Sequence, residues 1–149
     1  MKLHLLLALA LSAVFVGCNS ATPPGPRPFI GILNAKKIGT GPKETSRYDV
    51  LVHYENVVPD KFEAKVGFGY IPSDKNLKSV AASATGIYAI AHNEILHQSS
   101  GDLHLTIEPT AVRDLNGTLD GKIHAVLAPY PHGTEWRVAG HDVFPLAPE

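Results

Sequence analysis

The chain has 149 residues, a formal net charge of −1 and a single cysteine, and 44% of its residues are hydrophobic. This composition excludes a disulfide-stabilised scaffold and argues against a nucleic-acid partner, because there is no excess of basic residues and no Lys/Arg run. The length is that of one globular domain with a core of its own.

The first seventeen residues have the pattern of a secretory leader. Lys2 makes the start positive, and residues 3–16 are almost entirely apolar. This run is too short for a bilayer-spanning helix, which needs roughly 17 to 25 residues. Gly17 stands directly before Cys18, the only cysteine, and the stretch that ends there resembles the lipobox of bacterial lipoproteins. An ordinary leader, cleaved after Ala13, is the alternative.

The resemblance implies that residues 1–17 are a lipoprotein signal peptide and that Cys18 carries a thioether-linked diacylglyceride. Two or three acyl chains would hold the protein at a membrane of the cell envelope, since one chain alone anchors only reversibly. Asn19 does not match the Asp signal for inner-membrane retention, which favours the outer membrane in a Gram-negative cell. Residues 18–28 are rich in proline and form the expected tether, at most about 30 Å long at polyproline-II rise.

Apolar residues recur with period two in residues 29–149, which we expect to form one β domain. The expected strands cover residues 29–33, 48–55, 62–70, 85–91, 103–108 and 123–127, and a last run begins at residues 136–138 and resumes at residues 142–146. Clusters of turn residues separate them, among them Pro72-Ser73-Asp74, Asn116-Gly117 and Asp120-Gly121.

About seven short alternating strands predict an all-β fold, a two-sheet β-sandwich, because each strand has one apolar face to bury on another sheet. A small closed barrel is the alternative. An immunoglobulin-like topology is compatible with the pattern, although the Cys–Trp–Cys signature is missing. We expect residues 74–84 to cross between the sheets, and residues 93–97 are compatible with a helical turn.

Histidines provide the first candidate site. His53, His104 and His124 fall on the polar phase of three expected strands. If these strands are neighbours, the imidazoles meet on one face and bind Zn²⁺ or Cu²⁺. His92, Glu94 and His97 form a second candidate, and His141-Asp142 a third. The alternative is that all are ordinary surface imidazoles.

The loop of residues 128–134 provides the second candidate. It contains Tyr130 between two prolines, followed by His132. A tyrosine at a rigid loop tip contributes a large contact area at low entropic cost, so we expect Tyr130 and His132 to contact a partner. The alternative is that Tyr130 folds back and plugs the end of the core.

Motifs of hydrolases and calcium loops are missing, so we expect a non-enzymatic protein without a cofactor. The function that the sequence favours is a lipid-anchored binding or assembly module of the cell envelope. Its partners would be the membrane, through the N-terminal lipid, and another envelope protein or a polysaccharide. A histidine-based metal-binding lipoprotein is the alternative function.

Overall fold

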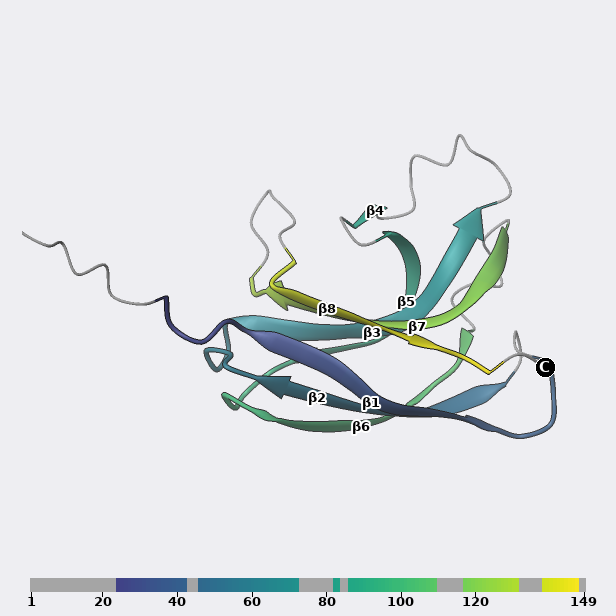
Figure 1. Cartoon of the computed structure of the whole chain (residues 1–149), viewed down its shortest axis with the longest axis horizontal. Helices are drawn as coiled ribbons and strands as arrows, with labels where there is room; N and C mark the ends of the chain where they lie inside the picture. Colours follow the sequence, from purple (N-terminus) through teal and green to yellow (C-terminus); the bar gives the residue numbers. More distant parts are fainter. Residues whose placement is uncertain are drawn as a thin grey trace, which may run out of the picture.

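Eight β-strands form the regular structure of the residues that the computed structural model describes, namely 24–42, 46–72, 82–83, 86–109, 117–131 and 138–147. Figure 1 shows them in two layers. The strands are β1 (Phe29–Ile38), β2 (Arg47–Glu55), β3 (Phe62–Pro72), β4 (Ala82–Ser83), β5 (Gly86–Ile95), β6 (Gly101–Ile107), β7 (Gly117–Pro129) and β8 (Gly140–Pro145).

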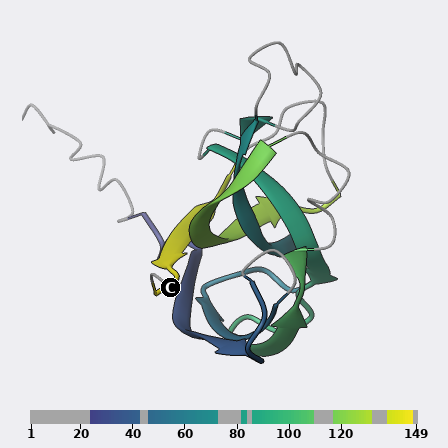
Figure 2. The same cartoon turned by 90° about the vertical axis from the view of Figure 1, so that its right-hand side faces the viewer.

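The two layers are antiparallel sheets, which confirms the predicted β-sandwich. Sheet A has the strand order β1-β2-β6, and sheet B has the order β4-β5-β3-β7-β8. Figure 2 shows the same strands from one end of the molecule. In the immunoglobulin fold, strands A, B and E are neighbours in one sheet and strands C, F and G in the other. The orders β1-β2-β6 and β3-β7-β8 match these two sets, with β5 next to the C position.

The core lies between the sheets and follows from the period-two pattern. Tyr48, Val50 and Val52 of β2 are almost fully buried, and so are Val66 and Phe68 of β3. The rings of Tyr48 and Phe68 meet edge to face across the sandwich, with centroids 5.6 Å apart. Such an aromatic contact stabilises a core beyond the apolar area that it buries.

One local expectation is wrong. Residues 93–95 belong to β5, because Asn93 and Ile95 pair with Lys65 and Glu63 of β3, so they form no helical turn. The crossing expected at residues 74–84 lies almost entirely outside the described residues, and the strands that flank it, β3 and β5, are neighbours in sheet B. The chain crosses to sheet A after β5, through residues 96–100, which precede β6.

The predicted turn at Asp120-Gly121 is a bulge inside β7. Phe68 pairs with Ile123 and Tyr70 with Leu119, so three residues of β7 face only Gly69 of β3. Gly121 has a φ of 77°, which glycine adopts without strain. The Asp120 carboxylate accepts a 2.8 Å hydrogen bond from the Lys122 amide and lies over Gly69. A turn signal therefore marks a bend within a long strand.

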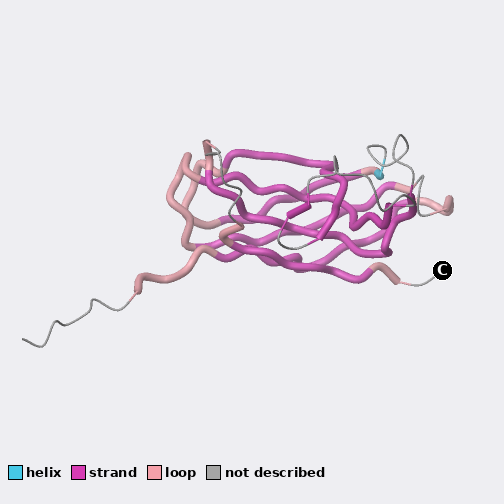
Figure 3. Tube along the Cα trace, turned by 90° about the horizontal axis from the view of Figure 1, so that it is seen from above, coloured by secondary structure: helices cyan, strands magenta, loops and turns pink. Residues whose placement is uncertain are grey.

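The edges of the two sheets meet where β1 lies beside β8. The Ile32 amide of β1, at an irregularity in its pairing with β2, donates a 2.7 Å hydrogen bond to Oδ2 of Asp142 in β8. Residues 24–28 enter β1 at the end of the sandwich shared by the turn before β3 and the turn before β6 (Figure 3). We call this the tether end.

Candidate functional site

The three histidines of the predicted metal site do not come together. His53 of β2 and His104 of β6 lie on the outer face of sheet A, whereas His124 lies on β7 of sheet B. Its neighbours Ile123 and Ala125 face the core, so the His124 side chain is on the outer face of sheet B. The core separates the two faces by about 10 Å or more. Among the described residues there is no group of three or more His, Cys, Asp or Glu that could hold a metal ion.

Two carboxylates hold the His53 ring. Its Nδ1 lies 2.6 Å from Oδ1 of Asp102, and its Nε2 lies 2.9 Å from Oε1 of Glu55. The hydrogen bond to Asp102, followed by that to Glu55, raises the pKa of His53 above its ordinary value of 6.5. When both nitrogens donate, the ring is an imidazolium and has no lone pair for a metal. His53 is therefore a hydrogen-bonded partner of two carboxylates.

The other histidine candidates also have ordinary partners. Nε2 of His92 lies 3.1 Å from Oε2 of Glu94, two residues along β5. His97 does not join them, because its Nδ1 lies 2.5 Å from Oδ1 of Asp60. Each pair is a single hydrogen-bonded contact near the surface.

On the outer face of sheet B, His124 links Asp120 to His141. Nδ1 of His124 lies 3.2 Å from Nε2 of His141, and Nε2 of His124 lies 3.3 Å from Oδ2 of Asp120. The two ring planes are inclined by only 21° with centroids 5.5 Å apart, so the nitrogens face each other almost head-on, as in an N–H···N hydrogen bond. Burial, and then the nearby His124, lower the pKa of His141.

This face of sheet B also contains a buried ion pair. Nζ of Lys65 lies 2.8 Å from Oε1 of Glu63, and the two side chains are only 6% and 3% exposed. Buried charges are tolerated when they are paired in this way. Because these two side chains are closed to solvent and engaged with each other, they are not available to a ligand.

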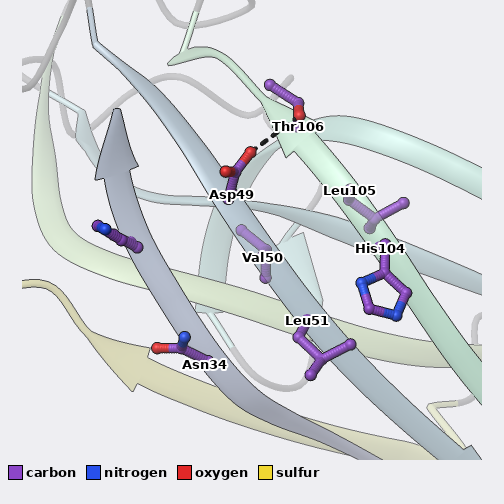
Figure 4. A pocket seen from close by; sticks show the side chains of 8 residues that line it. Asn34, Asp49, Val50, Leu51, His104, Leu105 and Thr106 are labelled. Atoms are coloured by element: carbon purple, nitrogen blue, oxygen red, sulfur yellow. Dashed lines mark hydrogen bonds between the residues drawn. The ribbon is translucent and has the colours of Figure 1, made fainter. Parts of the chain in front are cut away.

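The outer face of sheet A has a hollow of about 450 Å³, which we call the main hollow. This volume lies in the range of small-molecule sites in proteins. Figure 4 shows Asn34 and His104 on either side of Leu51, with Asp49 and Thr106 joined by a hydrogen bond beside them. The residues that line it are Asn34, Lys36, Asp49, Val50, Leu51, His104, Leu105 and Thr106.

Strand register explains this arrangement. Leu51 is paired with Asn34 of β1 on one side and with His104 of β6 on the other. In the next row of the same face, Asp49 lies between Lys36 and Thr106. Oγ1 of Thr106 donates a 3.0 Å hydrogen bond to Oδ1 of Asp49. Adjacent strands thus place an apolar floor between polar side chains.

A second hollow of about 290 Å³ lies farther along β2, toward the tether end. Its lining residues are His53, Glu55, Asn56, Ser99 and Ser100. Leu51 of the main hollow and His53 of the second hollow are two residues apart, and alternation along a strand places them on the same face. The two hollows therefore follow one another along β2.

Tyr130 lies at the tether end, where its amide donates a 2.8 Å hydrogen bond to the Lys61 carbonyl. The residue is 37% exposed, so a partner has access to part of it. His132 and Cys18 lie outside the described residues. Within the described ranges, no helix is long and apolar enough to cross a bilayer.

Sequence reasoning found His104 but missed the other residues of the main hollow. Asp49 and Thr106 were visible only as polar positions on two expected strands, and Asn34 and Lys36 lie beyond the expected strand of residues 29–33. Alternation with apolar residues shows that Asp49 and Thr106 point outward, but the order of the strands decides which residues are neighbours. Comparison with models of known protein families, with curated proteins and with solved structures finds no match.

Proposed function

We propose that this protein is a lipid-anchored, non-enzymatic binding module of the cell envelope, and that the outer face of sheet A is its binding surface. The main hollow is the observation that supports the binding role. In the part of the chain that the structure describes, Asn34, Lys36 and His104 line it without side-chain hydrogen bonds or ion pairs. Polar groups that gather in a hollow without partners are available to a ligand.

The place of the tether supports the same proposal. Residues 24–28 join the domain at one end of its long axis (Figure 1). The main hollow lies on the outer face of sheet A, away from that end. With a lipid on Cys18 and a tether of at most about 30 Å, the tether end would be near the membrane. The flank would remain open to an envelope protein or a polysaccharide, and Tyr130 is a further contact residue near the membrane.

Replacement of Cys18 by serine tests the anchor. We expect the Cys18→Ser variant to keep its leader, because lipidation of the cysteine precedes cleavage in bacterial lipoproteins, and to lose its labelling with fatty acid. Wild-type protein should be found in the membrane fraction with a labelled mature chain. Mass spectrometry of the N-terminal peptide and metabolic labelling with palmitate measure both effects.

Ser20→Ala is the matched control, since it changes the same segment and leaves the cysteine in place. It should behave like the wild type. If the Cys18→Ser variant has the mature size and membrane association of the wild type, the anchor proposal is wrong.

A further inference from the structure

The main hollow presents both donors and acceptors of hydrogen bonds around an apolar floor. Asn34 has an amide that donates and accepts, and His104 has one ring nitrogen of each kind when neutral. Asp49 uses Oδ1 for Thr106 and has a second carboxylate oxygen. Leu51 lies between Asn34 and His104 in the same row. A fitting ligand therefore has groups that both donate and accept, carried on a body with apolar faces.

The charges of this face argue against a polyanion. Lys36 lies beside Asp49, and His53 lies between Asp102 and Glu55. Farther along the strands, Arg47 pairs with Glu108 at 2.6 Å. Positive and negative groups alternate and nearly balance, so no long-range field attracts a strongly charged polymer of either sign.

The shape of the face suits an extended chain. The main hollow and the second hollow follow one another along β2, and the second hollow adds Ser99, Ser100 and Asn56 as hydrogen-bonding groups. Phe29 lies beside them, because it pairs with Glu55. The tip of its ring occupies the space over Gly31, and the side chain is 48% exposed. An exposed ring of this kind offers contact area to a flat, partly apolar ligand.

We infer that the outer face of sheet A binds an uncharged saccharide chain along β2. Sugar hydroxyls donate and accept at once, which matches Asn34, His104 and Asp49, and the C–H faces of the sugar rings match Leu51 and Phe29. This inference rests on the proposed binding function and names its ligand class. A free monosaccharide would fill only part of the two hollows, so the chain should bind more tightly than its single units.

The test uses full-length protein in detergent. Its binding is measured by co-sedimentation with insoluble chitin and cellulose and by retardation in affinity gels that contain soluble mannan or β-glucan. Dextran sulfate serves as the polyanion. Leu51→Arg places a long cation in the main hollow, and the double variant Asn34→Ala/His104→Ala removes hydrogen-bonding groups without adding volume. Ile71→Arg is the matched control, because Ile71 is exposed on β3 of sheet B.

We expect at least one uncharged polysaccharide to retain the wild-type protein. Leu51→Arg and Asn34→Ala/His104→Ala should each weaken this binding by about tenfold or more, and Ile71→Arg should leave it unchanged. Circular dichroism checks that each variant is folded. If Leu51→Arg is not folded, the double variant alone tests the inference. No retention by any uncharged polysaccharide, equal retention of the folded variants, or preference for dextran sulfate would overturn the inference.

Failure of the saccharide inference can be told apart from failure of the proposed membrane anchor. If the wild type is anchored in the membrane but binds no saccharide, only the inferred ligand class is wrong. If the protein binds saccharide but carries no lipid, the anchor proposal is wrong and the inference is supported.

Discussion

The contact between Gly69 and Asp120 offers the sharpest test of the fold. A Cβ atom at residue 69 would lie 1.8 Å from Oδ2 of Asp120 and 2.1 Å from its Cγ. Gly69 does not have a left-handed backbone, so alanine is excluded by the Asp120 side chain and not by its own φ angle. In the Gly69→Ala variant, the carboxylate must therefore leave its position.

Two contributions give the size of the effect. Forcing a methyl group into an occupied space destabilises a protein by about 1 to 3 kcal/mol. The displaced Asp120 also loses its hydrogen bonds with the exposed Lys122 amide and the part-buried His124 ring, and breaking the hydrogen bond of a buried group costs about 1 to 3 kcal/mol. Because the two changes share one side chain, we expect a total loss of about 2 to 4 kcal/mol in the free energy of unfolding.

A double-mutant cycle in urea isolates the contact. Asp120→Ala alone should lose about 1 to 2 kcal/mol through its hydrogen bonds. In the Asp120→Ala background the space over Gly69 is open, so Gly69→Ala should add less than about 1 kcal/mol. The coupling between the two changes should exceed about 1 kcal/mol, well above the usual error of additivity. Additive effects, or a neutral Gly69→Ala variant, would refute the packing described here.

Two further predictions concern the edge of the sheets and the His53 ion pairs. Asp142→Ala should lower the free energy of unfolding by about 1 to 3 kcal/mol, because it leaves the Ile32 amide without an acceptor. Asp142→Asn retains an acceptor oxygen and should lose less stability. Equal losses of the two variants in urea unfolding would contradict this role of Asp142. The raised pKa of His53 contributes stability that is complete below pH 6.5 and is lost as the pH rises through the pKa of the folded state. The melting temperature of the wild type should therefore fall relative to that of His53→Gln over this window, and parallel pH profiles of the two proteins would argue against the ion pairs.

The strands were largely predictable because their pattern is local. The alternation from Tyr48 to Tyr54 predicted β2 almost residue for residue, and it also predicted which side chains enter the core. The pattern was less informative in β7, where Gly121 interrupts the alternation. A glycine after an aspartate favours a tight turn and a bulge equally, and only the pairing with Gly69 of β3 distinguishes them.

The three histidines of the predicted metal site are separated for a different reason. Period two shows that His53, His104 and His124 are on the polar phase of their strands, but it does not tell in which sheet each strand lies. The neighbours of His53 are Asp102 on β6 and Glu55 on its own strand, so both of its ring nitrogens face carboxylates. His124 has a histidine neighbour, His141, which the hairpin of β7 and β8 brings beside it.

The sequence by itself determined the all-β class, the positions of most strands and the inward-facing residues, because these depend on the alternation of side chains along each strand. It also contains Cys18, the apolar run before it and the Pro-rich segment after it, on which the proposed anchor rests. Only the tertiary structure decided which outward-facing residues are neighbours. The main hollow exists because β1 and β6 lie on either side of β2, and this order depends on long-range pairing between residues as far apart as Tyr48 and Ile107.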